Sequence, residues 1–146
     1  MGNRRGFTLT ELMVVSTTTA LLATLSIPSI LASKLAANEA STITSLKMLA
    51  TAEEQFRVSS GTAGYGTLQE LSASNPRYIE EPLGNGKKSG YLFVLTLGTP
   101  ADSHWFAQAN PMKSGKTGNR HFFIDASGLI RTNPRGPATS ADSPID

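Results

Sequence analysis

The sequence predicts an α+β protein in which one long N-terminal helix packs against a small antiparallel β-sheet. An apolar stretch runs from Phe7 to Ala32 with Glu11 as its only ionisable side chain, which indicates a helix. Apolar residues then recur at three- and four-residue steps as far as Phe56. Runs rich in β-branched and aromatic residues follow after Gly61, and these predict strands.

The first part of the predicted helix, residues 7–33, has the length of a transmembrane segment. At 1.5 Å per residue, the stretch from Phe7 to Ala32 reaches about 39 Å, whereas the hydrocarbon core of a bilayer is roughly 30 Å thick. Arg4 and Arg5 precede the stretch and account for the whole excess of 13 Lys and Arg over 11 Asp and Glu residues. By the positive-inside rule, they would keep the N-terminus cytoplasmic and place the rest of the chain outside.

Two ordinary explanations of this N-terminus fit it incompletely. A cleaved secretory signal has an apolar centre of about 7–15 residues, which is shorter than the stretch found here. An uncleaved anchor would explain the length but not Glu11, because a charged side chain deep in a membrane helix costs roughly 2.5–3.5 kcal/mol on insertion scales.

The residues around Gly6 form a more specific pattern. The stretch RRGFTLTELMVV, residues 4–15, resembles the class III signal of type IV pilins and of type II secretion pseudopilins. The resemblance implies a leader, residues 1–6, that a prepilin peptidase removes between Gly6 and Phe7, and methylation of the new Phe7 amine. It also implies that the apolar helix stays in the inner membrane until subunits polymerise through it into a filament.

Glu11 has two interpretations, and they are compatible. Thr8 and Glu11 have the spacing of a capping box, in which each side chain accepts a hydrogen bond from the other residue's backbone N–H. The resemblance implies that Glu11 also pairs with the Phe7 amine of a neighbouring subunit, where a buried ion pair fixes the axial register. We favour the intersubunit pair, because capping boxes are common and carboxylates within membrane segments are rare.

The second part of the helix, residues 34–60, is predicted to be amphipathic and to continue without a break. Its predicted apolar face consists of Ala36, Ala40, Ile43, Leu46, Ala50 and Phe56. Gly61 is the first strong stop, so the helix is expected to run from near Thr8 to about Ser60. Pro28 lies where similar pilins have a helix-distorting proline, and we expect a kink there because proline lacks a backbone N–H.

Residues 61–132 are predicted to form a small α/β head. A short helix is expected at Thr67–Ser74 within a turn-rich connection. Four runs are expected to pair as an antiparallel meander: Tyr91–Leu97, Trp105–Ala109, His121–Ile124 and Leu129–Arg131. One face of this meander would pack on Ile43, Leu46 and Phe56. Residues 133–146, rich in Pro, Ser and Ala, are predicted to be a flexible tail.

Motifs that would indicate an enzyme or a metal site are incomplete. Residues 114–117 read SGKT, but the first glycine of a phosphate loop would fall at Asn110 and no helix is expected to follow. The two histidines, His104 and His121, belong to no metal-binding pattern, and the chain has no cysteine. Three aspartates that could ligate calcium, as in some pseudopilins, lack the dense spacing of a calcium loop: Asp125, Asp142 and Asp146. We therefore expect no catalytic residues, no cofactor and no metal.

Residues 77–135, from the predicted head and the start of the tail, include more basic than acidic residues. The basic residues are Arg77, Lys87, Lys88, Lys113, Lys116, Arg120, Arg131 and Arg135. The aromatic residues Tyr78, Tyr91, Trp105 and Phe106 are interspersed with them. Such a surface could bind DNA or an acidic polysaccharide weakly. We favour a solvated head whose basic residues complement an acidic patch on a neighbouring subunit, since no nucleic-acid motif accompanies the charge.

The sequence therefore predicts a non-enzymatic subunit of a type IV pilus-like filament that serves adhesion, motility, DNA uptake or secretion. The subunit would be a single-pass inner-membrane precursor first and part of an extracellular or periplasmic filament afterwards. Its implied partners are copies of itself, related pilins, the prepilin peptidase and the pilus or type II secretion assembly machinery. Two alternatives stay open: a type II secretion pseudopilin, and a monomeric membrane-anchored binding module with a basic head.

Overall fold

The computed structural model describes residues 6–59, 61, 64–99 and 104–145, and the side chains of residues 24–28 lie outside this description. The chain divides into two units, residues 1–34 and 35–146, which we describe separately. Both contain part of helix α1 (Leu9–Ser59). The bounds of α1 confirm the single long helix that the sequence predicts.

In the first unit, α1 begins at Leu9 and stays helical through residues 24–28. The predicted kink at Pro28 concerns a residue whose side chain lies outside the described part, so the kink stays a prediction. The described residues contain no helix that is both long and apolar enough to cross a membrane, so the predicted span at residues 7–33 is not found among them.

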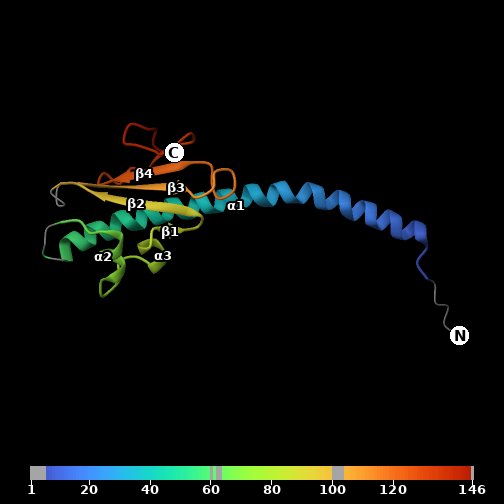
Figure 1. Cartoon of the computed structure of the whole chain (residues 1–146), viewed down its shortest axis with the longest axis horizontal. Coiled ribbons are helices and arrows are strands. Elements are labelled where there is room, and N and C mark those ends of the chain that lie inside the picture. The colour runs from blue at the N-terminus through green and yellow to red at the C-terminus, as the bar shows by residue number, and fades with distance from the viewer. Residues whose placement is uncertain (1–5, 60, 62–63, 100–103, 146) are drawn as a thin grey trace. The chain divides into compact units, whose positions relative to one another are not determined.

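The second unit contains a five-stranded antiparallel sheet with its strands in sequence order (Figure 1). The strands are β1 (Lys87–Lys88), β2 (Tyr91–Leu97), β3 (Trp105–Pro111), β4 (His121–Asp125) and β5 (Arg131–Asn133). The predicted meander is confirmed, although β5 begins two residues later than the run that predicts it. The sequence analysis does not predict β1, a two-residue strand that pairs with the start of β2.

Two short helices precede the sheet. The helix predicted at residues 67–74 is confirmed as α2 (Leu68–Ala73), with Thr67 and Glu70 forming a capping box at its start. A further helix, α3 (Glu81–Gly84), has a proline in its first turn and is not predicted from the sequence. Leu71 of α2 and Leu83 of α3 are fully buried, so both helices contribute to the core.

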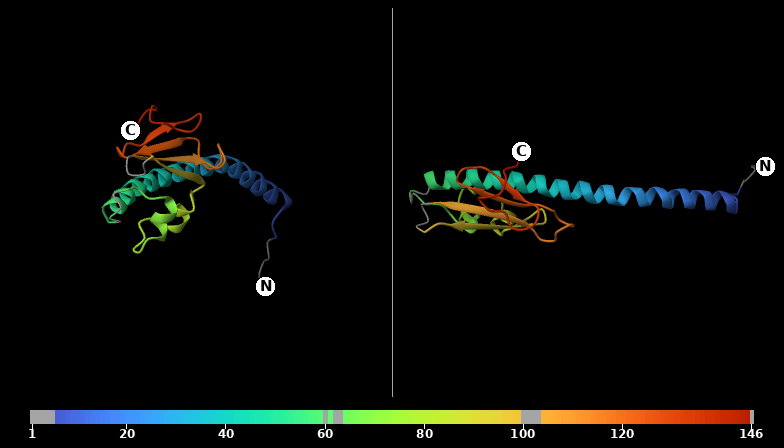
Figure 2. Two further views of the ribbon diagram at one scale, coloured as in Figure 1. Left: turned by 60° about the vertical axis from the view of Figure 1, so that its left-hand side comes forward. Right: turned by 90° about the horizontal axis from the view of Figure 1, so that it is seen from above.

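The second half of α1 and the sheet form two layers with the core between them (Figure 2). Leu46 and Leu49 of α1 are fully buried, and Ile43 and Phe56 pack against the same core. On β3, every second residue from Trp105 to Ala109 faces this core. These contacts confirm that the sheet packs on Ile43, Leu46 and Phe56.

The buried face of α1 is rotated relative to the predicted one. Ala36 and Ala40, which the periodicity places on the apolar face, are exposed. Four polar residues of α1 are buried instead: Glu39, Thr42, Ser45 and Glu53. The prediction is wrong at these positions because it follows the apolar residues alone. Glu39 and Glu53 can be buried because they accept hydrogen bonds from backbone N–H groups of the head.

The C-terminal segment folds back along β5, although the sequence predicts a flexible tail. The Thr132 N–H donates to the Ser143 carbonyl at 2.9 Å. Beyond it, the Ile145 N–H donates to the Ile130 carbonyl at 3.0 Å, and Ala138 is fully buried. The composition of the segment predicts little apolar burial, but its backbone hydrogen bonds to the edge of the sheet hold it in place.

Candidate functional site

A capping box begins helix α1, as the sequence predicts. The Thr8 N–H donates to Glu11 Oε2 at 2.8 Å, and the Glu11 N–H donates to Thr8 Oγ1 at 3.2 Å. The Thr8 hydroxyl also donates to Glu11 Oε2 at 2.8 Å. Within the described part of the chain, every hydrogen bond to the Glu11 carboxylate therefore ends on Oε2, and Oε1 has none.

The two residues of the predicted cleavage site precede this capping box. Gly6 and Phe7 are both exposed, and the Phe7 side chain is 81% accessible. A Cβ added at Gly6 would meet no atom within 4 Å, so local packing does not require a glycine there. Cleavage at this bond and methylation of Phe7 stay predictions, and residues 1–5 of the predicted leader lie outside the described residues.

The first half of α1 exposes large apolar side chains. Those described are Leu9, Leu12, Met13, Val14, Val15, Leu21, Leu22, Ile30 and Leu31, together with Phe7 before the helix. Leu9 is 77% and Val14 is 64% exposed. An open hollow of about 340 Å³ lies beside Glu11 and is lined by Phe7, Val14 and Val15. Exposed large apolar side chains in this number indicate contact with lipid or with another protein.

Hydroxyl side chains interrupt this surface but are satisfied within the helix. Ser16, Thr17, Thr18 and Thr19 each donate to the backbone carbonyl four residues earlier, at 2.6–2.8 Å. A polar group that is bonded inside its own helix does not need water or a partner chain. The run of hydroxyl residues therefore does not exclude an apolar environment.

In the second unit, three polar residues of α1 hold two loops of the head. We call Asn38, Glu39 and Ser41 the polar clamp. Asn38 Nδ2 donates to the Thr117 carbonyl at 2.9 Å, and the Ser41 and Ser89 hydroxyls are 2.8 Å apart. These bonds fix the β1–β2 turn and the β3–β4 loop to the helix.

Glu39 makes the strongest contacts of the polar clamp. Its Oε1 accepts the Asn119 N–H at 2.9 Å, and its Oε2 accepts Arg120 Nε at 2.7 Å. Burial raises the pKa of Glu39, but the hydrogen bonds from Asn119 and Arg120 and the charge of Arg120 outweigh it, and the net pKa is lowered. This pair cannot be predicted from the sequence pattern, because its partners are 81 residues apart and no local spacing signals a contact at that distance.

Close packing around the polar clamp requires two glycines. Gly90 has φ of +76°, and a Cβ added there would lie 2.7 Å from Thr117 Cβ. A Cβ at Gly118 would collide with the Tyr91 hydroxyl, which donates to the Arg120 carbonyl at 2.9 Å. Side chains at these positions would push the β3–β4 loop away from α1.

Glu53 is the second buried carboxylate of α1. It is fully buried, its Oε2 accepts the Gly66 N–H at 3.0 Å, and its Oε1 has no partner among the described residues. Burial raises the pKa of Glu53 to about 7, and the charges of Glu70 and Glu54 add to this effect. Glu53 therefore connects the end of α1 to the segment before α2 and changes charge near neutral pH.

Replacing Glu53 with glutamine is expected to reduce the pH dependence of stability. The folded protein binds the Glu53 proton more tightly than the unfolded chain does, so the free energy of unfolding falls as pH rises from about 4.5 to about 7. The fall attributable to Glu53 is roughly 3 kcal/mol. Denaturation of the detergent-solubilised chain at several pH values, followed by the fluorescence of Trp105, the only tryptophan, would measure it.

The matched control for this experiment is Glu54→Gln. Glu54 is the next residue of α1, half-exposed and paired with Arg57 at 2.8 Å. Its charge adds only a minor part to the raised pKa of Glu53, which burial dominates, so its replacement should keep most of the wild-type pH dependence. Comparing two variants of one chain also removes the contribution of His121, whose pKa burial lowers. A Glu53→Gln variant with the same pH dependence as the wild type would contradict the prediction.

The mixed basic and aromatic surface that the sequence suggests is only partly present. Tyr91 and Trp105 are 0% and 2% exposed, so neither can stack on a base or a sugar. Lys88 pairs with Glu80 at 3.1 Å, and Arg120 pairs with Glu39. Phe106 is half-buried and stacks on Phe123. This arrangement disfavours recognition of single-stranded nucleic acid by stacking.

The SGKT stretch forms a tight turn. The Thr117 N–H donates to the Lys113 carbonyl at 2.9 Å, and Gly115 has φ of +76°. The segment leads into β4 and not into a helix, so it lacks the helix N-terminus of a phosphate loop.

The histidines and aspartates singled out in the sequence lie apart from one another. His121 Nδ1 lies 2.7 Å from Asn110 Oδ1, and Asp125 accepts hydrogen bonds from Ser127 within its own turn. Asp142 accepts the Thr139 N–H at 2.7 Å. The described residues, which exclude Asp146, contain no group of three side chains placed to hold a metal ion.

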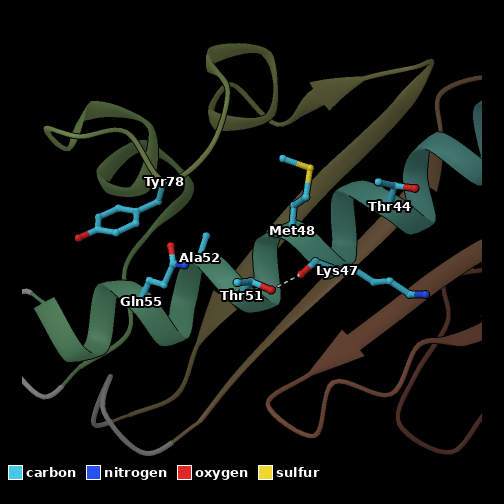
Figure 3. A pocket seen from close by; sticks show the side chains of 7 residues that line it. All are labelled: Thr44, Lys47, Met48, Thr51, Ala52, Gln55 and Tyr78. Atoms are coloured by element: carbon cyan, nitrogen blue, oxygen red, sulfur yellow. Dashed lines mark hydrogen bonds between the residues drawn. The ribbon is translucent and has the colours of Figure 1, made fainter.

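A groove of about 330 Å³ runs along one side of α1 (Figure 3). Tyr78, from the segment before α3, lines the groove together with six residues of α1: Thr44, Lys47, Met48, Thr51, Ala52 and Gln55. Lys47 is its only charged residue, and the Thr51 hydroxyl is already bonded to the Lys47 carbonyl at 3.1 Å. The groove offers an apolar contact surface and no evident catalytic group.

Comparisons of the chain with protein-family models, with curated proteins and with solved structures found no match. The resemblance of residues 4–15 to a class III signal therefore rests on the motif itself. The geometry adds a capping box with one free carboxylate oxygen and an exposed apolar first half of α1. The buried carboxylates Glu39 and Glu53 connect the head to the second half of α1.

Proposed function

We propose that this chain is a subunit of a type IV pilus-like filament. It is made as a single-pass precursor in the inner membrane, cut between Gly6 and Phe7, and methylated at the new Phe7 amine. Subunits then polymerise through the first half of α1, and the head faces outward. The observation that carries the proposal is the exposed apolar surface of that half-helix, which has Glu11 near its start.

A surface of this kind needs an apolar environment both before and after assembly. Ten large apolar residues between Phe7 and Leu31 are exposed, and each would face water in an isolated soluble chain. Burial of one such side chain stabilises by about 1.5–3 kcal/mol. Lipid satisfies this requirement in the precursor, and the helices of neighbouring subunits satisfy it in the filament.

The polar groups of the half-helix support the same environment. The hydroxyls of Ser16–Thr19 are bonded within the helix, as a lipid-facing segment requires. The one acidic group, Glu11, keeps Oε2 for the capping box and leaves Oε1 able to accept a hydrogen bond from a neighbour's amine.

The described residues bear differently on the two alternatives, the type II secretion pseudopilin and the monomeric binding module. A type II secretion pseudopilin would share the same N-terminus, and no contact in the head favours it over a pilin. A monomeric binding module would need a surface for its ligand, yet Tyr91 and Trp105 of the suggested basic and aromatic surface are buried. We therefore keep the filament subunit as the proposal.

Filaments sheared from the cell surface are expected to contain this chain in its processed form. The subunit should begin at Phe7 and carry one methyl group on its amine, because the resemblance implies both modifications. Electron microscopy of the filaments and intact-mass spectrometry of the subunit would check this. A surface subunit that still begins at Met1, or a processed chain found only as a membrane monomer, would contradict the proposal. Filaments confined to the periplasm would favour the pseudopilin.

A further inference from the structure

A short exposed turn between β3 and β4 presents two lysines and a methionine. We call residues 112–117 the basic turn. Residues 112–116 are all exposed, and Met112 is 54% accessible. The Lys116 N–H donates to the Lys113 carbonyl at 3.1 Å, and the Lys113 N–H donates to the Thr117 hydroxyl at 3.1 Å. The turn is therefore ordered by its own hydrogen bonds and projects its side chains outward.

The polar clamp holds the basic turn against α1. The Asn38 side chain binds the Thr117 carbonyl, and Glu39 binds the Asn119 and Arg120 N–H groups at the end of the same loop. Glu39 is the residue of this group that is nearly fully buried. The loop therefore has a fixed position on the helix only a few residues after the apolar segment ends.

Positive charge gathers at this end of the head. Strand register brings β1, the start of β2 and the end of β3 together, because Lys88 pairs with Tyr91 and Tyr91 pairs with Pro111. Lys87 and Lys88 thus lie at the same end of the sheet as the basic turn.

Two of the carboxylates at this end are already paired with cations of the head. Glu39 pairs with Arg120 at 2.7 Å, and Glu80 pairs with Lys88 at 3.1 Å. Within the described part of the chain, Lys113 and Lys116 form no ion pair, so the charge of the basic turn is available to a partner.

The opposite end of the head carries acidic groups. Strand β4 ends there at Asp125, which pairs in register with Phe106 near the start of β3. Glu53 also lies near this end, because it accepts a hydrogen bond from the Gly66 N–H. The neighbouring Tyr65 ring contacts Trp105, the first residue of β3. The basic turn therefore lies at the end of the head where its part of α1 begins, away from these two carboxyl groups.

We propose that the basic turn binds the anionic phospholipid headgroups of the membrane in which the precursor is anchored. This inference rests on the proposed membrane anchoring of residues 7–33. Asn38 lies five positions after Ser33, so the two residues are at most about 18 Å apart in any chain conformation. The basic turn, held at Asn38 and Glu39, is thus within reach of the headgroup layer.

The chemistry of the basic turn suits that layer. A lysine near an anionic membrane surface contributes about a fivefold gain in binding, and the exposed Met112 can enter the interface beside the lysine side chains. The same contact would hold the head at the membrane before assembly and would be released when the subunit leaves the bilayer.

The test uses the full processed chain in lipid nanodiscs with a single label. The chain has no cysteine, so Ser114→Cys places a unique environment-sensitive fluorophore in the basic turn. In nanodiscs that contain about one third phosphatidylglycerol, we expect the label to report a headgroup environment. In discs of phosphatidylcholine alone it should report water, and high salt should abolish the difference because it screens the charges.

The variant pair Lys113→Gln and Lys116→Gln should weaken the contact. With both substitutions, the equilibrium constant between the bound and free turn is expected to fall about 25-fold, or about fivefold for each lysine. The matched control is Lys47→Gln with Arg77→Gln, which removes the same charge from exposed positions outside the basic turn. The control should retain the response to phosphatidylglycerol.

Three outcomes would overturn the inference. A chain that enters nanodiscs stably but gives the same label signal in both lipids would overturn it and leave the proposed filament function intact. A signal that follows the number of subunits per disc and not the lipid charge would assign the basic turn to a neighbouring copy. A chain that does not enter nanodiscs at all would overturn both this inference and the proposed membrane anchor.

Discussion

Replacing Gly6 with leucine is expected to abolish removal of the leader. Cells would then accumulate a precursor that begins at Met1 and would contain no filaments built from it. The reason is steric, because in the proposed processing the residue before the scissile bond must be small for the bond to reach the active site of the membrane-bound peptidase. The fold should be unaffected, since a side chain at Gly6 would meet no atom within 4 Å.

The control for this substitution is Gly136→Leu, in the C-terminal segment. A Cβ at Gly136 also meets no atom within 4 Å, so both variants make the same change at an open glycine. Intact-mass spectrometry of the membrane fraction would show whether each subunit begins at Met1 or at Phe7. Normal processing of the Gly6→Leu variant would contradict the proposal of a prepilin-type cleavage site.

Much of the fold can be predicted because its elements depend on local patterns. Strand β2 has the bounds that its run of β-branched and aromatic residues predicts, Tyr91–Leu97. Helix α2 lies within residues 67–74, where a short helix is expected, and Thr67 and Glu70 form a local capping box at its start. In each case, the residues that determine the element lie within a few positions of one another.

The unpredicted elements depend on contacts between distant residues. Strand β1 has only two residues, too few for an alternating pattern, and exists because it pairs with the start of β2. The C-terminal segment is ordered by hydrogen bonds to β5 and not by its composition. Glu39 and Glu53 can lie on the buried face of α1 because backbone N–H groups later in the chain donate hydrogen bonds to their carboxylates.

The candidate site also has contacts that local spacing predicts and contacts that it does not. The capping box of Glu11 follows from the three-residue spacing to Thr8 and is confirmed. The buried contacts of the polar clamp do not follow from spacing, because they join α1 to a loop about 80 residues later. The proposed pair between Glu11 and a neighbour's Phe7 amine depends on how copies pack, which no spacing within one chain encodes.

Replacing Glu11 with glutamine separates the two roles of this residue. Glutamine keeps the shape of glutamate, and its side-chain oxygen can still accept the Thr8 N–H, so the capping box should persist. It carries no charge and cannot neutralise an amine. We therefore expect the Glu11→Gln chain to be processed and inserted normally but to give few or no surface filaments.

The expected size of the effect follows from the charge that would be left unpaired. An α-amino group has an ordinary pKa of about 7.7–8.0 and is largely protonated at neutral pH. Removing one partner of a buried ion pair typically costs about 3–5 kcal/mol. A cost of that size lowers the equilibrium constant for adding a subunit by roughly two to four orders of magnitude. Loss of a capping box alone costs about 1 kcal/mol, which is too little to stop assembly.

The contrast with Glu11→Ala decides between the two roles. Alanine removes both the charge and the capping bonds, so both variants should fail to assemble if the intersubunit pair dominates. Counting surface filaments by electron microscopy, with processing checked by mass, would measure this. Coexpression with the wild type should also reduce filament number, since each variant subunit leaves one amine unpaired. Normal filament yield from Glu11→Gln together with a defect in Glu11→Ala would instead assign the role of Glu11 to the capping box, because only the bonds through Oε2 would then matter.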